Sequence, residues 1–256
     1  MLVSLRAIGV LWLREMKRFL RARSRIIGTL AMPLLTLAFF SMGLYGVQLP
    51  CIPKEVDYVN FLLPGVIGAT ILFSSMFSGI SVIWDREFGF LKEIMITPVS
   101  RLSIILGRIA GSATISLIQG SIILFVSLLF MTIKKPTGYG LLMALLFMLL
   151  IAVTFISLGL IFASRMSDVQ GFNVIMSFII FPLFLLSGAM LPIARLPTPI
   201  YLLAYANPLT YGIDGLRASL MKFSNWEPLF DLTILSCLTI AMMTASVYLF
   251  TRAEKD

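Results

Sequence analysis

The sequence predicts an all-α integral membrane protein that crosses the bilayer with six transmembrane helices. The chain has 256 residues, of which 59% are hydrophobic and 12% charged, whereas about 25% of residues are charged in soluble domains. A soluble protein of this size is excluded, because so few polar side chains could not cover its surface. Six uncharged apolar runs reach the roughly 20 residues that a spanning helix needs: 26–47, 61–84, 109–131, 139–163, 169–190 and 232–251.

The distribution of basic residues predicts which side of the membrane the chain ends face. Most of the 20 Lys and Arg residues lie before the first run, between runs two and three, between runs four and five, or after the sixth. Lys and Arg accumulate on the cytoplasmic side of membrane proteins. We therefore expect a multi-pass protein of the plasma (cytoplasmic) membrane with both termini in the cytoplasm. Residues 26–256 would form its single transmembrane domain.

The N-terminal segment 1–25 is predicted to be an amphipathic helix in the membrane interface. Its two faces differ in polarity: Leu5, Ile8, Trp12, Met16 and Phe19 lie opposite Arg14, Lys17, Arg18, Arg21 and Arg25. Such a helix turns its basic face to anionic lipid, although a simple positive-inside anchor has the same composition. Its basic region and the following apolar run are too long for a signal peptide, so we expect it in the mature chain. Membrane lipid, and not nucleic acid, is the expected partner.

The inner loop between runs two and three, residues 85–108, is predicted to hold a short cytoplasmic helix. One face of this helix would be formed by Phe88, Leu91, Ile94 and Met95. Pro98 ends it, because proline disfavours helical geometry in the preceding residue and clashes with a continuing helix. A rigid element here could transmit a push from a cytoplasmic partner. An interfacial helix without a partner would show the same pattern.

The outer loop between runs five and six, residues 191–231, is predicted to form a helical hairpin. Its two apolar stretches, 200–206 and 209–221, are too short to cross the bilayer. The step from Asn207 to Pro208 between them favours a turn. Asp214 and Arg217 stand three residues apart and are expected to pair on one helical face. The hairpin could be re-entrant and gate a pathway, or it could be a surface loop stabilised by aromatic residues.

The energy for any transport is expected to come from another polypeptide. None of the six runs contains Asp, Glu, Lys, Arg or His, whereas ion-coupled carriers usually place ionisable groups at membrane depth. The chain also lacks a G-x-x-x-x-G-K-[ST] phosphate-binding loop. We therefore expect this chain to bind no cofactor. The sequence contains no histidine and shows no nucleophile–base or metal-ligand spacing, so neither a catalytic site nor a metal site is predicted.

Two motifs resemble those of type-2 ABC export permeases. The first runs from Arg86 to Arg101 and is followed by Ile105-Leu-Gly-Arg108. The second comprises Leu186-Ser-Gly-Ala-Met-Leu-Pro192 and Asn207-Pro-Leu-Thr-Tyr-Gly-Ile-Asp-Gly-Leu-Arg217. The motifs stand in the family's order and on opposite sides of the membrane. The six spans and the basic N-terminal helix also match, so the resemblance covers nearly the whole chain.

The resemblance implies that this chain is part of a larger transporter. In the family, two permease chains, here expected to be a homodimer, assemble with two ABC-type ATP-binding subunits that hold ATP and Mg²⁺. Substrate then moves outward by alternating access. The residues that would couple to the ATP-binding subunit are Glu87, Gly89, Leu91, Glu93 and Pro98. The residues of the extracellular gate hairpin would be Asn207, Pro208, Tyr211, Asp214 and Arg217.

Runs two and five are the expected walls of the transport pathway. The residues that could line it are Ser74, Ser78, Asn173, Met176 and Phe181. A lining with aromatic and methionine side chains suits a hydrophobic or amphipathic substrate. Helix packing explains the same residues, since small side chains allow spanning helices to approach closely.

Export of a hydrophobic or amphipathic, drug-like compound is the predicted function, because the second motif looks closest to the multidrug and antibiotic-resistance branch of the family. Export of a lipid-linked polysaccharide is the alternative within the family. An ion-coupled secondary carrier and a membrane scaffold that transports nothing are the alternatives from other classes.

Overall fold

The computed structural model describes residues 4–43, 47, 57–89, 99–130, 136–193 and 197–253. In these ranges the chain forms α-helices and no β-strand, which confirms the predicted all-α class. The helices are α1 (Leu5–Arg21), α2 (Arg23–Gly43), α3 (Tyr58–Phe77), α4 (Ile80–Glu87), α6 (Arg101–Phe130), α7 (Gly138–Arg165), α8 (Val169–Leu186), α9 (Thr198–Ala206), α10 (Pro208–Met221) and α11 (Pro228–Ala253).

Five helical segments are long and apolar enough to cross a membrane. They are α3 taken together with α4, then α6, α7, α8 and α11, and they correspond to the second to sixth apolar runs. A sixth candidate is the pair of α1 and α2, which qualifies only as a pair and bends by 70° at the break. The structure thus has five candidate spans, or six if the bent pair is one span; the predicted first span, 26–47, does not qualify without α1, which was predicted to lie in the interface.

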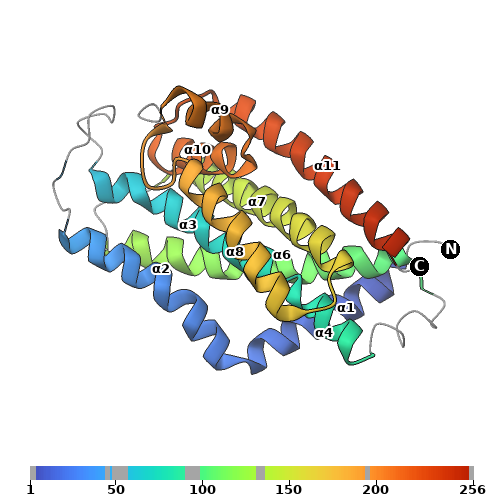
Figure 1. Cartoon of the computed structure of the whole chain (residues 1–256). Coiled ribbons are helices and arrows are strands. Elements are labelled where there is room, and N and C mark those ends of the chain that lie inside the picture. Colours follow the sequence, from blue (N-terminus) through green and yellow to red (C-terminus); the bar gives the residue numbers. More distant parts are fainter. Residues whose placement is uncertain are drawn as a thin grey trace.

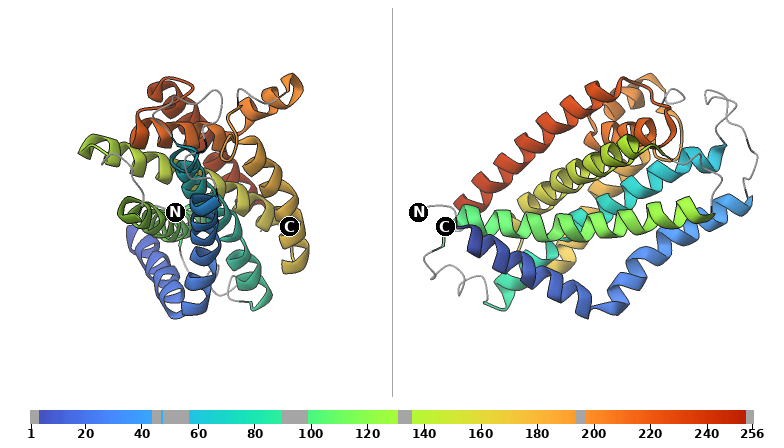
Figure 2. Two further views of the ribbon diagram at one scale, coloured as in Figure 1. Left: turned by 90° about the vertical axis from the view of Figure 1, so that its left-hand side faces the viewer. Right: turned by 180° about the vertical axis from the view of Figure 1, so that it is seen from behind.

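The helices form a bundle with α7 at its centre. α7 packs against α3, α6, α10 and α11, and α1 packs along α6. α1 and α2 together form a V at the side of the bundle (Figure 1, Figure 2). Both chain termini and the last turn of α4 lie at one end, here called the terminal end, whereas α9 and α10 lie at the opposite end, here called the hairpin end (Figure 1).

The second apolar run is divided into α3 and α4 at Ser78 and Gly79. The hydroxyl groups of Ser78 and Ser81 donate to backbone carbonyl oxygens of the preceding turn, at 2.6 and 2.8 Å. The break also lies against α7, where a Cβ atom on Gly79 would be 2.8 Å from the carbonyl oxygen of Gly159. A Cβ atom on Gly159 would in turn be 2.6 Å from the carbonyl oxygen of Met76. The two glycines thus allow direct backbone contact between the broken run and α7.

Two short helices occupy the segment between α8 and α11, and the expected turn between them is confirmed. The Asn207 side chain accepts a hydrogen bond from the N–H of Leu209 at 3.0 Å, which is the N-cap interaction of α10. Pro208 takes the first helical position, where no N–H donor is needed. Lys222 ends α10 in the left-handed conformation, with φ at 56°. α10 packs on α7, where Gly215 lies directly against the Phe147 ring.

α6 begins at Arg101, well before its apolar run. Residues 101–108, which were predicted to belong to the inner loop, form its first two turns. The helix can extend beyond the apolar run because Arg101 and Arg108 find polar partners on neighbouring helices.

Candidate functional site

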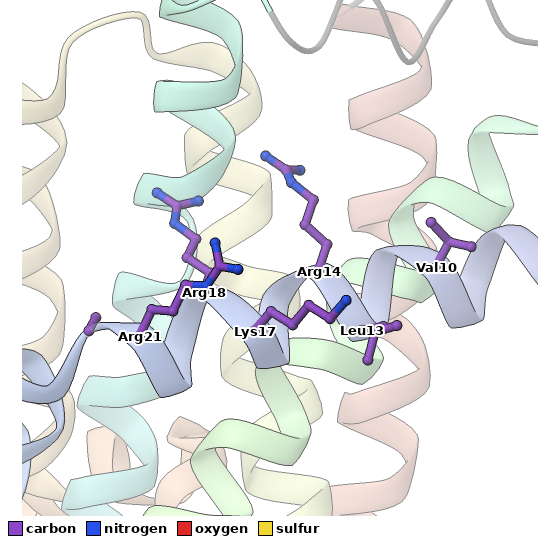
Figure 3. Close-up of a pocket in the computed structure, with 7 residues that line it drawn as sticks. Val10, Leu13, Arg14, Lys17, Arg18 and Arg21 are labelled. Atoms are coloured by element: carbon purple, nitrogen blue, oxygen red, sulfur yellow. The ribbon is translucent and has the colours of Figure 1, made fainter.

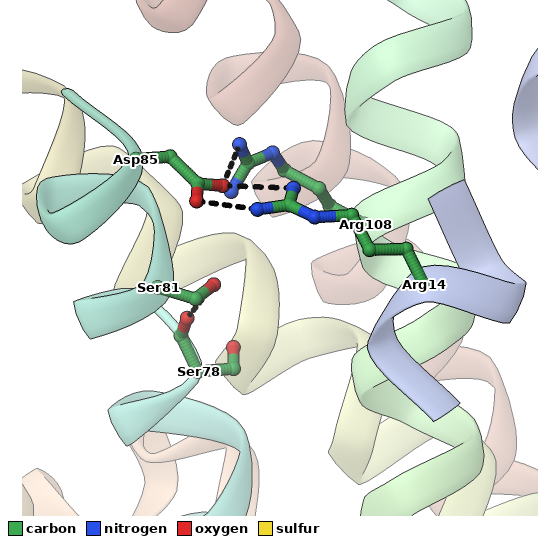
Figure 4. A network of polar contacts seen from close by, with 5 residues as sticks. All are labelled: Arg14, Ser78, Ser81, Asp85 and Arg108. Atoms are coloured by element: carbon green, nitrogen blue, oxygen red, sulfur yellow. Dashed lines mark hydrogen bonds and ion pairs between the residues drawn. The ribbon is translucent and has the colours of Figure 1, made fainter. Parts of the chain in front are cut away.

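Asp85, in the last turn of α4, is the centre of a charged cluster at the terminal end. Its carboxylate accepts hydrogen bonds from Arg14 of α1, with N–O distances of 2.6 and 3.1 Å. It also accepts one from Arg108 of α6, at 2.6 Å. Figure 4 shows the two guanidinium groups converging on this one carboxylate. A single acidic side chain therefore connects three helices.

The cluster is largely buried and carries more positive than negative charge. The side chains of Asp85 and Arg108 are 6% and 4% exposed, and that of Arg14 is 30% exposed. Nε and Nη1 of Arg108 have no hydrogen-bond partner among the described residues. A buried ion costs free energy unless an opposite charge compensates it. The buried position of Arg108 therefore depends on Asp85.

Two further arginines anchor the chain where it leaves α4 and where it enters α6. Arg86 donates to the carbonyl oxygens of Ser164 and Met166 at the end of α7, both at 3.1 Å. Arg101 donates to the carbonyl oxygen of Thr251 near the end of α11, at 2.7 Å. Helices leave their last carbonyl groups without intrahelical partners, and cations there interact favourably with the helix dipole. The inner loop is therefore fixed to the bundle on both sides.

Of the residues predicted to couple to an ATP-binding subunit, Glu87 and Gly89 are described. Glu87 is the last residue of α4 and is exposed. Gly89 has φ at 74°, a left-handed conformation that glycine adopts without strain and that turns the chain out of a helix. Leu91, Glu93 and Pro98 lie outside the described residues, as does most of the predicted inner-loop helix.

The arginines of α1 do not all turn toward lipid, and this part of the prediction is wrong. Arg14 reaches across to Asp85, and the guanidinium group of Arg18 lies over the Trp84 ring, 5.1 Å from its centroid. Both partners belong to the end of α4. The basic face of α1 is thus used in part inside the protein, because α4 offers it an acid and an indole.

A surface cavity of about 660 Å³ lies along α1. Figure 3 shows that the side chains lining it are basic or apolar, namely Val10, Leu13, Arg14, Lys17, Arg18 and Arg21. Lys17 and Arg21 are exposed. Cations next to apolar side chains suit the headgroup of an anionic lipid, so lipid stays the predicted partner of this surface.

Arg217 of α10 is a buried charge at the hairpin end, and only 1% of its surface is exposed. Its Nη2 atom donates to the carbonyl oxygen of Gly188 at 2.6 Å and lies 3.4 Å from that of Ala189. The guanidinium group also lies over the Phe61 ring of α3, 3.8 Å from its centroid. Burial lowers the pKa of Arg217 to about 10, while the charge of Asp214 acts in the opposite direction. Arg217 thus ties α10 to the turn after α8 and to α3.

Asp214 does not bond to Arg217, although both lie in the described range 197–253, so the predicted pair is wrong. Its carboxylate accepts hydrogen bonds from the backbone N–H groups of Asn225 and Trp226, at 2.8 and 3.1 Å, and from the Asn225 side chain at 2.7 Å. Burial raises the pKa of Asp214, and these N–H donors and the charge of Arg217 counteract the shift. The segment before α11 folds back over α10 and supplies closer partners than the helix itself.

The remaining hairpin residues also bond to backbone groups. The Asn207 side chain donates to the carbonyl oxygen of Leu183 in α8 at 2.6 Å. The Tyr211 hydroxyl donates to the carbonyl oxygen of Tyr205 at 2.8 Å. Tyr211 also belongs to a row of five aromatic rings whose neighbouring centroids are 4.7 to 6.3 Å apart, in the order Tyr201, Tyr205, Trp226, Tyr211 and Phe230.

The predicted pathway residues do not share one surface of this chain. On α8, Met176 is completely buried, Asn173 is half-buried and Phe181 is 59% exposed. The Ser74 hydroxyl accepts a hydrogen bond from α6 at 3.0 Å, and the Ser78 hydroxyl bonds to its own helix. The contacts of the two serines fit the packing role that was the alternative, and a lining role stays a prediction.

Sequence reasoning assigned no role to Asp85, Arg108 or Asp231. Arg108 gave a signal, because a charge next to an apolar helical run requires a partner. The partner could not be found from spacing, since 23 residues separate Arg108 from Asp85. Asp231 is buried beside Asp214, and both its oxygens lack a hydrogen-bond partner among the described residues. In the part of the chain that the structure describes, no three His, Cys, Asp or Glu side chains meet as metal ligands.

Comparison with known proteins identifies similar chains. The family model described as ABC-2 type transporter matches residues 6–221. The chain is 31% identical over 212 residues to the putative transport permease ycf38 of Pyropia yezoensis, covering 81% of this chain and 71% of that protein. It is 25% identical over 218 residues to the inner membrane transport permease YadH of Escherichia coli strain K12, covering 82% and 81%. It is 28% identical over 229 residues to nodulation protein J of Rhizobium leguminosarum bv. viciae, covering 85% of each.

Proposed function

This chain belongs to the ABC-2 type transporter family and is a transport permease, and on this basis we propose that it is the membrane subunit of an ATP-driven exporter. A separate ATP-binding subunit, present in two copies, supplies the energy. Two copies of the permease move a hydrophobic or amphipathic compound outward by alternating access. The ATP-binding subunit docks on the inner loop through Glu87, Gly89, Leu91, Glu93 and Pro98.

The observation that carries this proposal is the anchoring of the inner loop. Arg86 fixes its beginning to the end of α7, and Arg101 fixes its end to α11. A displacement of the loop is therefore applied directly to two long helices of the bundle. A surface loop that transmits no force would not require hydrogen bonds to the bundle at both of its ends.

The homodimer and the substrate class are supported by exposed apolar faces on α2 and α8. Their large exposed side chains include Ile27, Met32, Leu35 and Phe39 on α2, and Val174, Phe178, Phe181 and Leu185 on α8. A second copy that covers these faces would place Phe181 at the wall between the copies. Such a wall is apolar and aromatic, which suits a hydrophobic compound.

Export of a lipid-linked polysaccharide is the second candidate, and the row of five aromatic rings at the hairpin end favours it. An aromatic ring offers a flat apolar face with a polar edge, which suits a sugar ring. Replacing Tyr201 and Tyr205 by leucine separates the candidates. Loss of glycan export with drug efflux unchanged would favour the second candidate, and the reverse result would favour the first.

The test of the proposed function is assembly with an ATP-binding subunit. The chain is co-expressed with candidate ATP-binding subunits, and the purified complex is assayed for vanadate-sensitive ATP hydrolysis. Combining Glu87→Gln with Glu93→Gln is expected to reduce both co-purification and hydrolysis. The control is Glu227→Gln, an exposed acid at the hairpin end. Assembly and transport that are unchanged by the double substitution would contradict the assignment of the inner loop.

A further inference from the structure

The end of α4 lies between two groups of helices and contacts them in different ways. Its backbone packs against α7 and α8, and Arg86 adds bonds to the carbonyl groups at the end of α7. Three long-range side-chain contacts connect it to α1 and α6. Asp85 bonds to Arg14 and Arg108, and Trp84 lies under the guanidinium group of Arg18.

α1 and α6 in turn are closely packed on each other. A Cβ atom on Gly107 or Gly111 of α6 would lie 2.9 Å from the Cβ atom of Leu11 or Glu15 of α1, respectively. The indole N–H of Trp12 donates to the Thr114 hydroxyl at 3.0 Å. α1 and α6 therefore behave as one packed pair, which α4 contacts through Asp85.

We propose that Asp85 is a positioning residue that joins the end of α4 to the pair of α1 and α6, so that a push on the inner loop moves all three together. This inference rests on the proposed function, because the push is attributed to the ATP-binding subunit. Without the Asp85 charge, α4 loses its bonds to Arg14 and Arg108 and keeps its packing against α7 and α8 and the contact between Trp84 and Arg18 of α1. The inner loop could then move without moving α1.

The charge balance of the cluster explains why a single acid, Asp85, can join α4 to α1 and α6. Two guanidinium groups share one carboxylate, and removing Asp85 would leave the buried charge of Arg108 without that carboxylate. Because Nε and Nη1 of Arg108 have no hydrogen-bond partner among the described residues, the compensation of its charge there depends on the bond from Nη2 to Asp85. The pairing is also directional, because guanidinium and carboxylate groups form planar hydrogen-bonded pairs. Asp85 therefore fixes both the distance and the orientation of α4 relative to α1 and α6.

The first experiment uses the permease alone in nanodiscs, with both native cysteines, Cys51 and Cys237, replaced by serine. Spin labels at Val10 of α1 and at Phe88 after α4, both exposed, report the distance across the cluster. A single narrow distance peak is expected, and Asp85→Glu should keep it. The double variant Asp85→Asn with Arg108→Gln removes one charge of each sign and so keeps the net charge. It should lose the narrow peak.

A second label pair, Phe88 with Val174 of α8, serves as the internal control. The bonds of Asp85 go to α1 and α6, whereas α4 also packs against α8, so this peak should stay narrow in every variant. A Val10–Phe88 peak that stays narrow in the double variant would overturn the proposal. Broadening of both pairs would also overturn it, because it would show general loosening and not a specific joint.

The second experiment adds the ATP-binding subunit and traps the complex with ATP and vanadate. In the unsubstituted chain the Val10–Phe88 distance should stay constant while the Val10–Val174 distance shifts. In the double variant the Val10–Val174 shift should disappear, and an equal shift in both chains would overturn the proposal. Absence of vanadate-sensitive hydrolysis with any ATP-binding subunit would instead contradict the proposed function. The distances in the permease alone would still decide whether Asp85 joins the helices.

Discussion

The terminal end and the hairpin end both bury arginine and aspartate side chains, but they satisfy these charges in different ways. At the terminal end, Asp85 pairs with the side chains of Arg14 and Arg108 from two other helices. At the hairpin end, Arg217 donates to backbone carbonyl groups and Asp214 accepts from backbone N–H groups. The first arrangement connects helices through paired charges, whereas the second connects α10 mainly to backbone groups of the surrounding turns, with Arg217 also lying over Phe61 of α3.

This difference indicates different mechanical roles for the two ends. Each charge of the Asp85 cluster depends on a charge in another helix, so a displacement of one helix acts on the others. The bonds of Arg217 and Asp214 instead fix the shape of turns, because backbone groups in those turns have no other helical partner. The terminal end is thus suited to transmitting a movement, and the hairpin end to holding α10 in place.

The largest expected effect comes from Asp85→Asn. It removes the negative charge that pairs with Arg108 among the described residues, which should lower the free energy of unfolding by about 3–5 kcal/mol. The measurement is chemical denaturation in detergent micelles, with Glu227→Gln as the control. Equal stability of Asp85→Asn and the control would show that the cluster does not hold the helices together.

Arg217→Lys tests the hairpin end and should have the next largest effect. Lysine keeps the charge but loses the flat group that covers Phe61 and reaches the Gly188 carbonyl oxygen. We expect the free energy of unfolding to fall by about 1.5–3 kcal/mol, the range for hydrogen bonds to charged groups. The matched control is Arg165→Lys, which changes an exposed arginine. If both variants lowered the free energy of unfolding by the same small amount, then the charge of Arg217 would matter and the geometry of its guanidinium group would not.

Gly65→Ala tests whether the turn held by Arg217 is rigid. A Cβ atom on Gly65 of α3 would lie 2.8 Å from the carbonyl carbon of Ala189. Backbone atoms at this distance must shift, which should cost about 1–3 kcal/mol. Gly28→Ala is the control, because a Cβ atom there meets nothing within 4 Å. An unchanged stability of Gly65→Ala would mean that the turn moves freely, contrary to the role of Arg217.

Thr239→Val should have the smallest effect on stability. It tests the middle of the bundle, which lies between the terminal end and the hairpin end. The hydroxyl groups of Thr154 in α7 and Thr239 in α11 are 2.7 Å apart. Hydrogen bonds between spanning helices contribute about 0.6 kcal/mol on average. We therefore expect Thr239→Val to lower the free energy of unfolding by that amount. Thr244→Val on the same helix, whose hydroxyl bonds only within α11, should be neutral by comparison. If Thr239→Val lowered the free energy of unfolding as much as Asp85→Asn, the charged groups at the two ends would not be more important for stability than a hydrogen bond in the middle of the bundle.

Composition and apolar run length predicted most of the fold, because every backbone polar group in lipid must be satisfied within a helix. The run at 139–163, for example, became α7 (Gly138–Arg165) with nearly the same bounds. The break at Gly79 was not predicted, since it depends on the approach of α7 and not on local sequence. The early start of α6 was missed for a similar reason, because Arg101 is stabilised by a carbonyl group of α11.

The site was predicted less well, because its contacts join residues far apart in the sequence. Spacing placed Asp214 and Arg217 on one helical face but could not show that Asn225 and the turn at Gly188 offer better partners. The basic face of α1 was recognised, but its contact with Asp85 was not. Local patterns therefore located α1 and the hairpin, and tertiary contacts determined what their charges bond to.

The central claim is that energy reaches this permease from another subunit through the terminal end. Inside-out vesicles that contain the chain and its co-purifying ATP-binding subunit should accumulate ethidium, a hydrophobic cation, when ATP is added. Vesicles with the chain alone should not accumulate it, with or without a proton or sodium gradient. Ethidium accumulation by the chain alone, driven by an ion gradient, would contradict the account.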